Sequence, residues 1–311
     1  MSAMGLTEFG GPEVLRALEL PVPEPGPGEV RVRVRAATVN PVDTMVRRGL
    51  AFVSDAPPPY VPGMEAAGIV DAIGAGTDTD LDVGDDVMAV IATSGTRGGY
   101  AEQVVLPAES VVRMPTGLTY EQAATIPMNG LTARMALDLL QLPEAATIAV
   151  VGSAGAVGGY TVQLAVADGV RVIADAAPKD EELVRSLGAD IVLPRGDGYA
   201  ALVREQVPDG VDGLVDTAGR VVQTASAVRD GGRIATSAGG SPVTDERGIV
   251  TSNTFVPQYA REHAKLERLR ELAQEGRLTA RIATTVPAGE AVKAHRLLEK
   301  GGLRGRIVLT R

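Results

Sequence analysis

The residues TIAVVGSAGAVG at positions 147–158 combine an apolar run, a glycine-rich turn and the beginning of a helical pattern. Thr147–Val151 is typical of a buried strand, and the apolar residues within 157–167 recur at helical spacing. Gly155 would let a phosphate approach the backbone, and Gly158 would let the helix pack closely on the strand. The stretch therefore predicts a turn that binds the pyrophosphate of a dinucleotide.

The N–H groups at the start of that helix, helped by the helix dipole, are suited to hold phosphate oxygens. Ser153 stands where the usual G-x-G-x-x-G pattern has its first glycine. A glycine-rich turn alone is weak evidence, because such turns are common. The residues predicted to contact the cofactor in this turn are Ser153, Ala154, Gly155, Ala156, Val157 and Gly158.

Strands and helices alternate after the turn, which strengthens this prediction. Continuous apolar runs follow at Val170–Ala174, Ile191–Leu193, Leu214–Val215 and Ile234–Ala235, with helical segments such as Glu181–Leu187 between them. Such strands, separated by helices, indicate a parallel sheet that is covered on both faces.

Ligands of open parallel sheets bind at the carboxyl ends of the strands. Four residues that follow the predicted strands are therefore further candidates for contact with the cofactor. They are Ala218, Ser237, Ala238 and Phe255.

The two flanks of the chain have a different character. Short strand patterns and closely spaced glycines predict a compact all-β unit over the first 118 residues, and a capping-box pattern begins at Thr119. After residue 254 come charged helices, Gln258–Glu275 and Glu290–Lys300, and a closing strand, Gly305–Thr310. That strand would be isolated unless it returns to the first lobe. We predict one domain of residues 1–118 and 254–311, into which a nucleotide-binding domain of residues 119–253 is inserted.

Composition excludes several classes of function. A net charge of -9 without a Lys/Arg run is unfavourable for binding duplex nucleic acid. No apolar stretch approaches the roughly 18–20 residues that a membrane-spanning helix needs, and Met1–Gly11 does not look like a secretion signal. We therefore expect a cytoplasmic protein. With no Cys and only His263 and His295, we expect no metal cluster, disulfide or cysteine nucleophile.

Several segments, in order along the whole chain, resemble the quinone oxidoreductase branch of the medium-chain dehydrogenases. The segments are LTEFGGPEVL (6–15), VNPVD (39–43), PGMEAAG (62–68), VGDDV (83–87), GGYAE (98–102), GLTA (130–133) and RGRIVL (304–309). The resemblance implies a Rossmann doubly wound parallel sheet inserted into a mainly-β GroES-like catalytic domain. It also implies a homodimer that pairs through the edge strand of the nucleotide domain.

Zinc members of this superfamily have Gly-His-Glu where this chain has Gly63-Met64-Glu65, and they carry a Cys ligand near the segment at 39–43. A catalytic zinc needs about three protein ligands, so we predict a zinc-independent enzyme. Hydrogen bonds must then polarise a carbonyl. Conjugated acceptors need less polarisation, so the expected substrates are quinones and α,β-unsaturated carbonyl compounds.

The end of the strand after the glycine turn bears on the choice of cofactor. An acid there would bind the ribose hydroxyls of NAD and repel the extra phosphate of NADP. Asp175 has the right chemistry, but zinc alcohol dehydrogenases have their acid at the position of Ala176, and successive strand residues face opposite ways. Lys179 and Arg195 either pair with a 2′-phosphate or are solvated surface charges. NADPH is favoured over NADH.

The resemblance also suggests residues at the reacting centre. Asn40 would lie beside the nicotinamide and donate to a developing oxyanion; alternatively it caps a turn before Pro41. Asn129 and Thr132 would face the nicotinamide from a helix, or serve only in helix packing. Arg306 is either a phosphate contact or a surface residue, and Asp43 and Glu65 are expected to accept backbone N–H bonds. The predicted substrate-binding residues are Tyr60, Met64 and Tyr100, although core packing is favoured for Tyr100.

Two alternatives to an NADPH-dependent quinone or enone reductase stay open. The chain is compatible with a nucleotide-binding structural or regulatory protein that has little turnover. It is also compatible with an enoyl reductase that tailors a carrier-bound substrate, although the sequence shows no basic docking patch for a carrier. No general acid stands out, so the proton of the product is expected to come from solvent.

Overall fold

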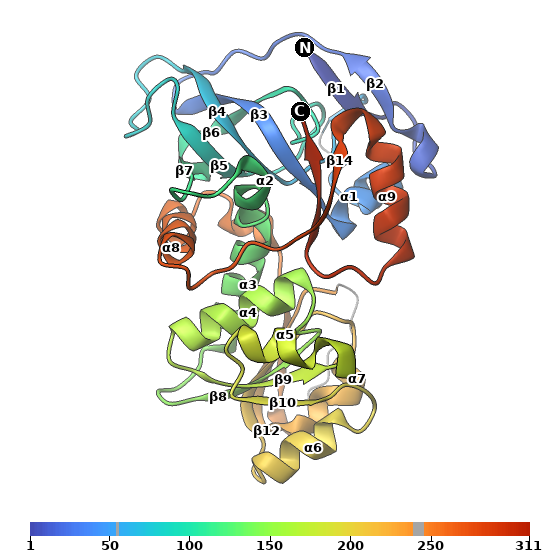
Figure 1. Cartoon of the computed structure of the whole chain (residues 1–311), viewed down its shortest axis with the longest axis vertical. Helices are drawn as coiled ribbons and strands as arrows, with labels where there is room; N and C mark the ends of the chain where they lie inside the picture. Colours follow the sequence, from blue (N-terminus) through green and yellow to red (C-terminus); the bar gives the residue numbers. More distant parts are fainter. Residues whose placement is uncertain (54–55, 239–245) are drawn as a thin grey trace. The chain divides into compact units, whose positions relative to one another are not determined.

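The computed structural model describes residues 1–53, 56–238 and 246–311 of the 311-residue chain, which divides into two compact units. The first unit comprises Met1–Met128, Pro257–Gly276 and Ala280–Arg311, and the second comprises Asn129–Val256 and Arg277–Thr279. Figure 1 labels elements of both units, among them β3 (Glu29–Val39) in the first and β8 (Thr147–Val151) in the second. Residues 119–128 thus belong to the first unit, about ten residues beyond the boundary that the sequence suggested.

The second unit contains a six-stranded sheet in which every pair of neighbours is parallel. Its strands are β8 (Thr147–Val151), β9 (Arg171–Ala176), β10 (Ile191–Pro194), β11 (Val211–Asp216), β12 (Val228–Thr236) and β13 (Val250–Asn253). Their order is β10-β9-β8-β11-β12-β13. This is the doubly wound Rossmann order, which reverses direction between β8 and β11. The predicted parallel sheet is confirmed.

Helices cover this sheet. They are α3 (Pro127–Leu140, which begins in the first unit), α4 (Ala156–Ala167), α5 (Glu181–Ser186), α6 (Tyr199–Gln206) and α7 (Val221–Thr224). Short 3-10 turns accompany them at η3 (Pro178–Asp180), η4 (Ala225–Ala227) and η5 (Glu246–Gly248). α4 packs against β8 and β9, and its residues from Gly158 to Ala165 are all buried. A helix that is apolar on every side belongs in the interior, so α4 is firmly seated on the sheet.

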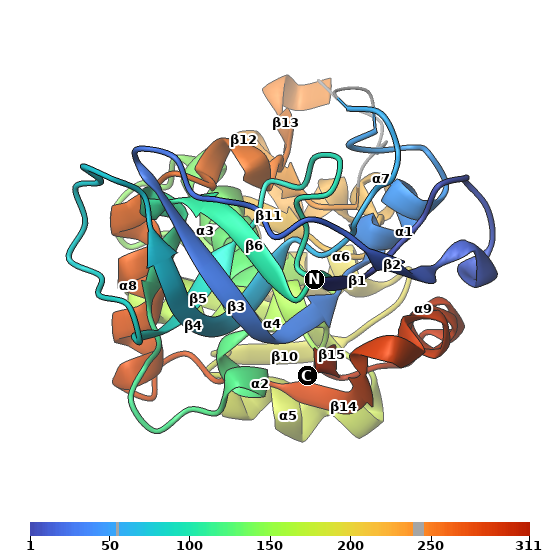
Figure 2. The same cartoon turned by 90° about the horizontal axis from the view of Figure 1, so that it is seen from above.

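The first unit is built on a second, mainly antiparallel sheet. Its strand order is β14 (Ile282–Pro287), β15 (Arg306–Thr310), β3 (Glu29–Val39), β4 (Glu65–Ile73), β5 (Asp86–Val90) and β7 (Val111–Arg113), while β6 (Gln103–Pro107) also pairs with β3. Figure 2 shows β3 running beside β4 and β6. β1 (Ser2–Gly5) and β2 (Arg16–Glu19) form a separate pair. Because β15 pairs with β3, the end of the chain completes the sheet that its beginning started.

The first unit also contains α1 (Pro41–Arg47), α2 (Tyr120–Ala123), α8 (His263–Gln274) and α9 (Ala291–Lys300). Its 3-10 turns are η1 (Pro12–Val14), η2 (Ala108–Ser110), η6 (Val256–Tyr259, whose first residue belongs to the second unit) and η7 (Ala288–Glu290). Among the described residues, no helix has both the length and the apolar character that crossing a bilayer requires.

Two helices differ from the sequence prediction. α1 lies in a region expected to be strands and turns; it forms because Pro41 occupies its first turn and the Asp43 carboxylate accepts the Asn40 N–H at 2.7 Å. The helix expected from Gln258 begins only at His263, since Glu262 has non-helical dihedral angles (φ -78°, ψ 68°). The predicted capping box is confirmed: Thr119 and Gln122 each accept the other's N–H, at 3.0 and 3.3 Å.

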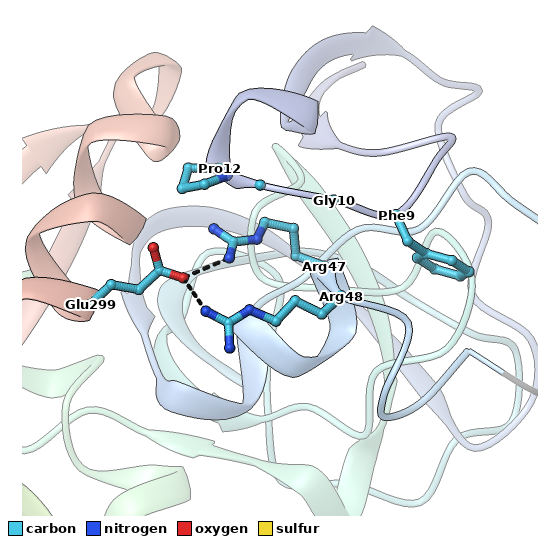
Figure 3. Close-up of a pocket in the computed structure, with 7 residues that line it drawn as sticks. Phe9, Gly10, Pro12, Arg47, Arg48 and Glu299 are labelled. Carbon is cyan, nitrogen blue, oxygen red and sulfur yellow. Dashed lines mark hydrogen bonds and ion pairs between the residues drawn. The ribbon is translucent and has the colours of Figure 1, made fainter.

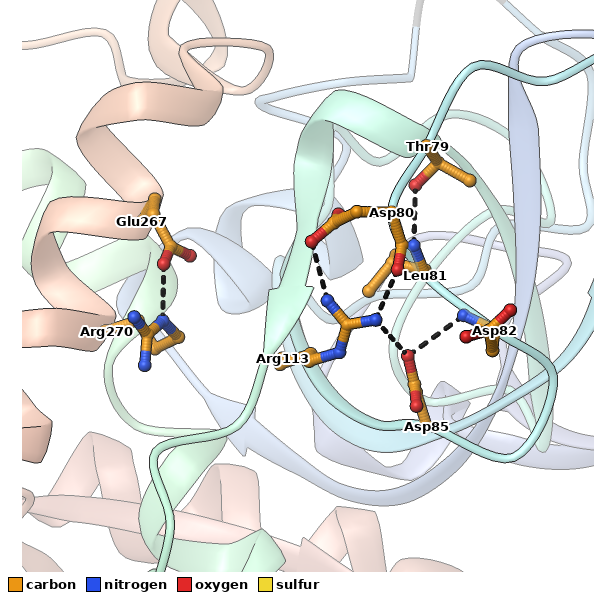
Figure 4. A network of polar contacts seen from close by, with 8 residues as sticks. All are labelled: Thr79, Asp80, Leu81, Asp82, Asp85, Arg113, Glu267 and Arg270. Atoms are coloured by element: carbon orange, nitrogen blue, oxygen red, sulfur yellow. Dashed lines mark hydrogen bonds and ion pairs between the residues drawn. The ribbon is translucent and has the colours of Figure 1, made fainter.

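An exposed polar network holds the turn between β4 and β5 (Figure 4). The Arg113 guanidinium on β7 contacts the Asp80 carboxylate at 2.6 Å and the Asp85 carboxylate at 2.9 Å, and it also donates to the Asp80 carbonyl. Exposed ion pairs contribute about 0–1 kcal/mol each. The network therefore orders this loop more than it stabilises the fold.

Candidate functional site

The turn between β8 and α4 has a backbone that only glycine adopts readily. Gly152 has φ +83°, in the left-handed region. The Ser153 hydroxyl is buried and donates to the Val150 carbonyl at 2.9 Å, so it holds the turn from inside. Gly155 is the N-cap of α4. Ser153 thus has a structural role in the turn, while Gly152, to which the sequence assigned no part, makes the sharp change of direction.

Gly158 lies where α4 approaches the turn most closely. A Cβ atom at this position would be 2.2 Å from the Gly152 carbonyl oxygen and 2.9 Å from the Ser153 Cα. Both are backbone atoms, so they cannot move aside as the end of a flexible side chain would. The predicted close packing at Gly158 is present.

The first turn of α4 presents hydrogen-bond donors. None of the hydrogen bonds among the described residues uses the N–H groups of Ala156, Val157 or Gly158 as donors. The first N–H groups of a helix have no partner within the helix, and together with the dipole they attract an anion. At Gly155 a Cβ atom would meet only the Gly152 carbonyl, at 3.0 Å. The turn therefore fits the pyrophosphate of a dinucleotide.

Asp175 lies at the end of β9, one residue before the last. Its Oδ1 accepts the N–H groups of Gly152 at 2.7 Å and Ser153 at 3.0 Å, and its side chain is buried. The carboxylate thus faces back onto the turn and acts as one of its structural supports. This agrees with the interpretation that Asp175 is turned away from the ribose position.

Two cations follow the carboxyl end of β9. Lys179 is exposed in η3, and the backbone N–H of Arg195 donates to the Ala176 carbonyl at 2.9 Å. Both side chains are exposed, and neither forms an ion pair with any described residue. Both residues therefore follow the carboxyl end of β9, and their contact with a 2′-phosphate stays a prediction.

The other predicted cofactor contacts divide by burial. Ala218, Ala238 and Phe255 are exposed near the carboxyl ends of β11, β12 and β13, and Ser237 is half-buried there. Asn129 and Thr132, on α3, are buried. Sequence reasoning overlooked Thr217, whose N–H and hydroxyl both donate to the Val151 carbonyl at 2.9 Å. Thr217 thereby ties the end of β11 to the end of β8, beside the point where the strand order reverses.

The first unit buries a polar cluster around Glu65. Its Oε1 accepts from the hydroxyl of Thr38 and from Asn40 Nδ2 at 3.2 Å, while Oε2 accepts the N–H of Met128 at 2.8 Å. Burial raises the pKa of Glu65, and the charge of Arg306 and these hydrogen bonds oppose that rise. Glu65 is therefore a structural acceptor, as expected. Arg306 is buried beside it, so of the two alternatives for Arg306 the surface role is wrong.

The Asn40 carboxamide is oriented by this cluster. Its Nδ2 donates to Thr38 Oγ1 at 2.9 Å and to Glu65 Oε1, and the side chain is fully buried. Because the Thr38 hydroxyl is hydrogen-bonded to Glu65 Oε1, these two acceptor oxygens lie on the same side of the Asn40 amide nitrogen. Thr38 and Glu65 thus set the direction of the Asn40 amide. The sequence analysis did not identify Thr38 as part of this cluster.

A second buried cluster joins Asp43, Tyr100 and His295. Asp43 accepts the N–H of Gly63 at 2.9 Å, and the Tyr100 hydroxyl lies 3.1 Å from His295 Nε2. Burial raises the pKa of Asp43 to about 7, and burial together with the nearby Arg47 charge lowers the pKa of His295 to about 4. His295 is therefore neutral at pH 7 and serves in packing.

The three predicted substrate-binding residues are all buried. Tyr100 is 1% exposed and Met64 is 1% exposed, and both Tyr60 and Tyr100 belong to the hydrophobic core of the first unit. The Tyr60 hydroxyl donates to the Val53 carbonyl at 3.1 Å, and its ring stacks on Phe9 at 5.5 Å between centroids. Core packing accounts for Tyr100, which the sequence favoured. Substrate contact by Tyr60 or Met64 stays a prediction.

Comparison with known proteins identifies the family. The sequence family described as the alcohol dehydrogenase GroES-like domain matches residues 26–116. The family described as zinc-binding dehydrogenase matches residues 187–309. The 2-methylene-furan-3-one reductase of Solanum lycopersicum is 30% identical over 319 aligned positions, which cover 99% of this chain and 79% of that protein. The chain belongs to the medium-chain dehydrogenase/reductase family.

Two further members of the medium-chain family extend the comparison. The quinone oxidoreductase of Sus scrofa is 29% identical over 325 aligned positions, covering 99% of this chain and 97% of that protein. The solved structure of a mycobacterial protein in complex with NADPH matches with a TM-score of 0.86 at 29% identity, over 100% of both chains. The resemblance to the quinone oxidoreductase branch of the medium-chain dehydrogenases is thereby confirmed.

The description of the second family model raises the question of zinc. The residues present do not fit a catalytic zinc: Met64 stands where zinc members have His, and it is 1% exposed. Over residues 1–53, 56–238 and 246–311, no group of three or more His, Cys, Asp or Glu side chains is arranged to hold a metal ion. A thioether and lone carboxylates are an unsuitable donor set for this metal.

Proposed function

We propose that the protein is an NADPH-dependent, zinc-independent oxidoreductase that reduces quinones or α,β-unsaturated carbonyl compounds. The observation that carries the proposal is the turn at Gly152–Gly158, with its three N–H donors, at the point where a doubly wound sheet reverses its strand order. Family membership supports it, because similar members are named as reductases of such acceptors.

NADPH supplies the hydride when it is bound. In our proposal the amides of Ala156, Val157 and Gly158 bind its pyrophosphate, and Lys179 and Arg195 bind its 2′-phosphate. The loops that carry Ala218, Ser237, Ala238 and Phe255 contact the remainder of the cofactor, and Asn129 and Thr132 approach it from α3.

At the reacting centre, we propose that the Asn40 amide hydrogen that points away from Thr38 and Glu65 donates a hydrogen bond to the acceptor oxygen. Thr38 and Glu65 hold the Asn40 amide in one orientation, so little reorganisation is needed when charge develops on the substrate. In a conjugated acceptor that charge spreads to the distant oxygen, and the proton comes from solvent.

The test is oxidation of NADPH, followed by absorbance, with a panel of simple quinones and enones. We expect turnover with at least one acceptor, and about tenfold lower kcat for Asn40→Ala, the loss of one hydrogen bond to a charged group. Addition of a chelator should leave the rate unchanged. NADPH binding without turnover of any acceptor would instead favour the binding-protein alternative.

Cofactor preference provides a second test. Because Lys179 and Arg195 are exposed cations at the end of β9, the double variant Lys179→Ala/Arg195→Ala should raise the KM for NADPH about tenfold or more and leave that for NADH unchanged. The control is Arg171→Ala, an exposed arginine at the opposite end of the same strand. An equal loss with both cofactors would show that these side chains do not bind the 2′-phosphate.

A cytoplasmic location and a homodimer stay predictions. The edge strand β13 is the element through which we propose that two copies pair, since it ends the sheet and its Val250 is 46% exposed. Cell fractionation checks the location, and the mass of the protein in solution checks the homodimer.

A further inference from the structure

A cavity of about 480 Å³ in the first unit borders the buried cluster of Asp43, Tyr100 and His295 through Arg47, and no role has been assigned to it. It is lined by residues 9–12, by Arg47 and Arg48 at the end of α1, and by Glu299 on α9. Figure 3 shows both arginines extending from α1 toward the Glu299 carboxylate. The cavity thus combines two cations, one anion and the ring of Phe9, which is 48% exposed.

The charges in this cavity are not balanced. Arg47 and Arg48 each place a terminal nitrogen 2.6 Å from the same oxygen, Oε1 of Glu299. Two guanidinium groups therefore share one carboxylate, which leaves a net charge of about +1 in a protein whose overall charge is -9. The two cations lower the pKa of Glu299, so the carboxylate is ionised at neutral pH.

Arg47 adds a second, independent observation. Its side chain is only 1% exposed, and its Nε and second terminal nitrogen have no hydrogen-bond partner among the described residues. A buried charged donor without a partner is costly, and such groups require an explanation. An oxyanion that displaces the Glu299 carboxylate would take its place on Arg47 Nη2 and Arg48, and its further oxygens could then approach the unpartnered nitrogens of Arg47.

We propose that this cavity binds the phosphate group of a small molecule, with the Glu299 carboxylate occupying the site until the ligand displaces it. Two guanidinium groups match the charge of a phosphate monoester, about −1.5 to −2 at pH 7. Arginine is the residue best suited to phosphate recognition, because its planar donors bind two oxygens at once. The exposed Phe9 ring and Pro12 suit an apolar substituent on that phosphate.

Phenyl phosphate, inorganic phosphate and acetate are the probes, titrated calorimetrically at constant ionic strength. The protein is first saturated with NADP⁺, so that the proposed pyrophosphate site is occupied. We expect phenyl phosphate to bind more tightly than inorganic phosphate, and acetate least tightly. Glu299→Gln removes the competing charge and should tighten phenyl phosphate binding about tenfold, whereas Arg48→Gln should weaken it about tenfold.

The two variants distinguish this proposal from a purely structural ion pair. If the pair were only structural, Glu299→Gln would not tighten phenyl phosphate binding while Arg48→Gln weakens it. Both replaced side chains are partly exposed, at 50% for Arg48 and 30% for Glu299, so the variants are expected to fold. Arg171→Gln, at an exposed arginine of the second unit that belongs to neither proposed phosphate site, is the matched control and should bind phenyl phosphate as the wild type does. The proposal is overturned if Glu299→Gln does not bind more tightly, if Arg48→Gln binds as well as the wild type, or if acetate equals phosphate.

Discussion

Gly158→Ala is expected to raise the dissociation constant of NADPH on the order of 100-fold. The new methyl group would lie 2.2 Å from the Gly152 carbonyl oxygen, so α4 and the turn must separate. A hydrogen bond to a charged group contributes about 1.5–3 kcal/mol. The amides of the first helical turn would all move together, so weakening two such bonds lowers the affinity on the order of 100-fold. Fluorescence titration with NADPH measures the change.

The matched control for this substitution is Gly198→Ala, in the same unit. Gly198 has φ -80°, and a Cβ atom there would have no heavy atom within 4 Å. It should therefore bind NADPH as the wild type does. If Gly158→Ala bound NADPH within about threefold of the wild type, the close contact would not govern cofactor binding. A denaturation curve of each variant shows whether the loss reflects binding or unfolding.

Glu65→Leu should lower the free energy of unfolding by about 3–5 kcal/mol, the usual cost of removing one partner from a buried charge pair. Leucine has a similar size but accepts no hydrogen bond, so the hydroxyl of Thr38, the amide of Asn40 and the N–H of Met128 would all lose an acceptor. The charge of Arg306 would also lose its nearby carboxylate. Denaturant unfolding measures the difference.

Two further variants delimit the effect at Glu65. Glu65→Gln keeps an acceptor oxygen and should lose clearly less stability than Glu65→Leu. Glu8→Leu removes a glutamate that is 64% exposed and paired with Arg16 at 3.0 Å, and it should change stability by less than about 1 kcal/mol. Equal stability of Glu65→Leu and the wild type would mean that the buried cluster does not hold the first unit together.

The glycine turn was predictable because its signal is local. An apolar run, a glycine turn and a helical period occupy twelve consecutive positions, 147–158. Each of these depends on contacts within a few residues, and β8 and α4 indeed begin and end within one residue of the expected positions. The same holds for the capping box at Thr119, whose two hydrogen bonds span three residues.

Polar side chains were harder to interpret, because a sequence does not show what surrounds a charge. Arg306 looked like a phosphate ligand or a surface residue, yet it is buried beside Glu65. Arg47 attracted no attention, yet it is 1% exposed and faces Glu299, which lies 252 positions away. Charged residues are seldom buried unless they are paired, and such pairs join distant parts of the chain.

By itself the sequence determined the class of the protein: a parallel α/β unit with a dinucleotide turn, no cysteine for a zinc site, and segments typical of the medium-chain family. These follow from periodicity and residue type, which act over short distances. Only the tertiary structure decided the order of the strands, the direction of the Asp175 carboxylate and the support of Asn40 by Thr38 and Glu65. Each of these depends on hydrogen bonds between residues that are far apart in the chain, such as Asn40 and Glu65 or Gly152 and Asp175, and no local pattern encodes them.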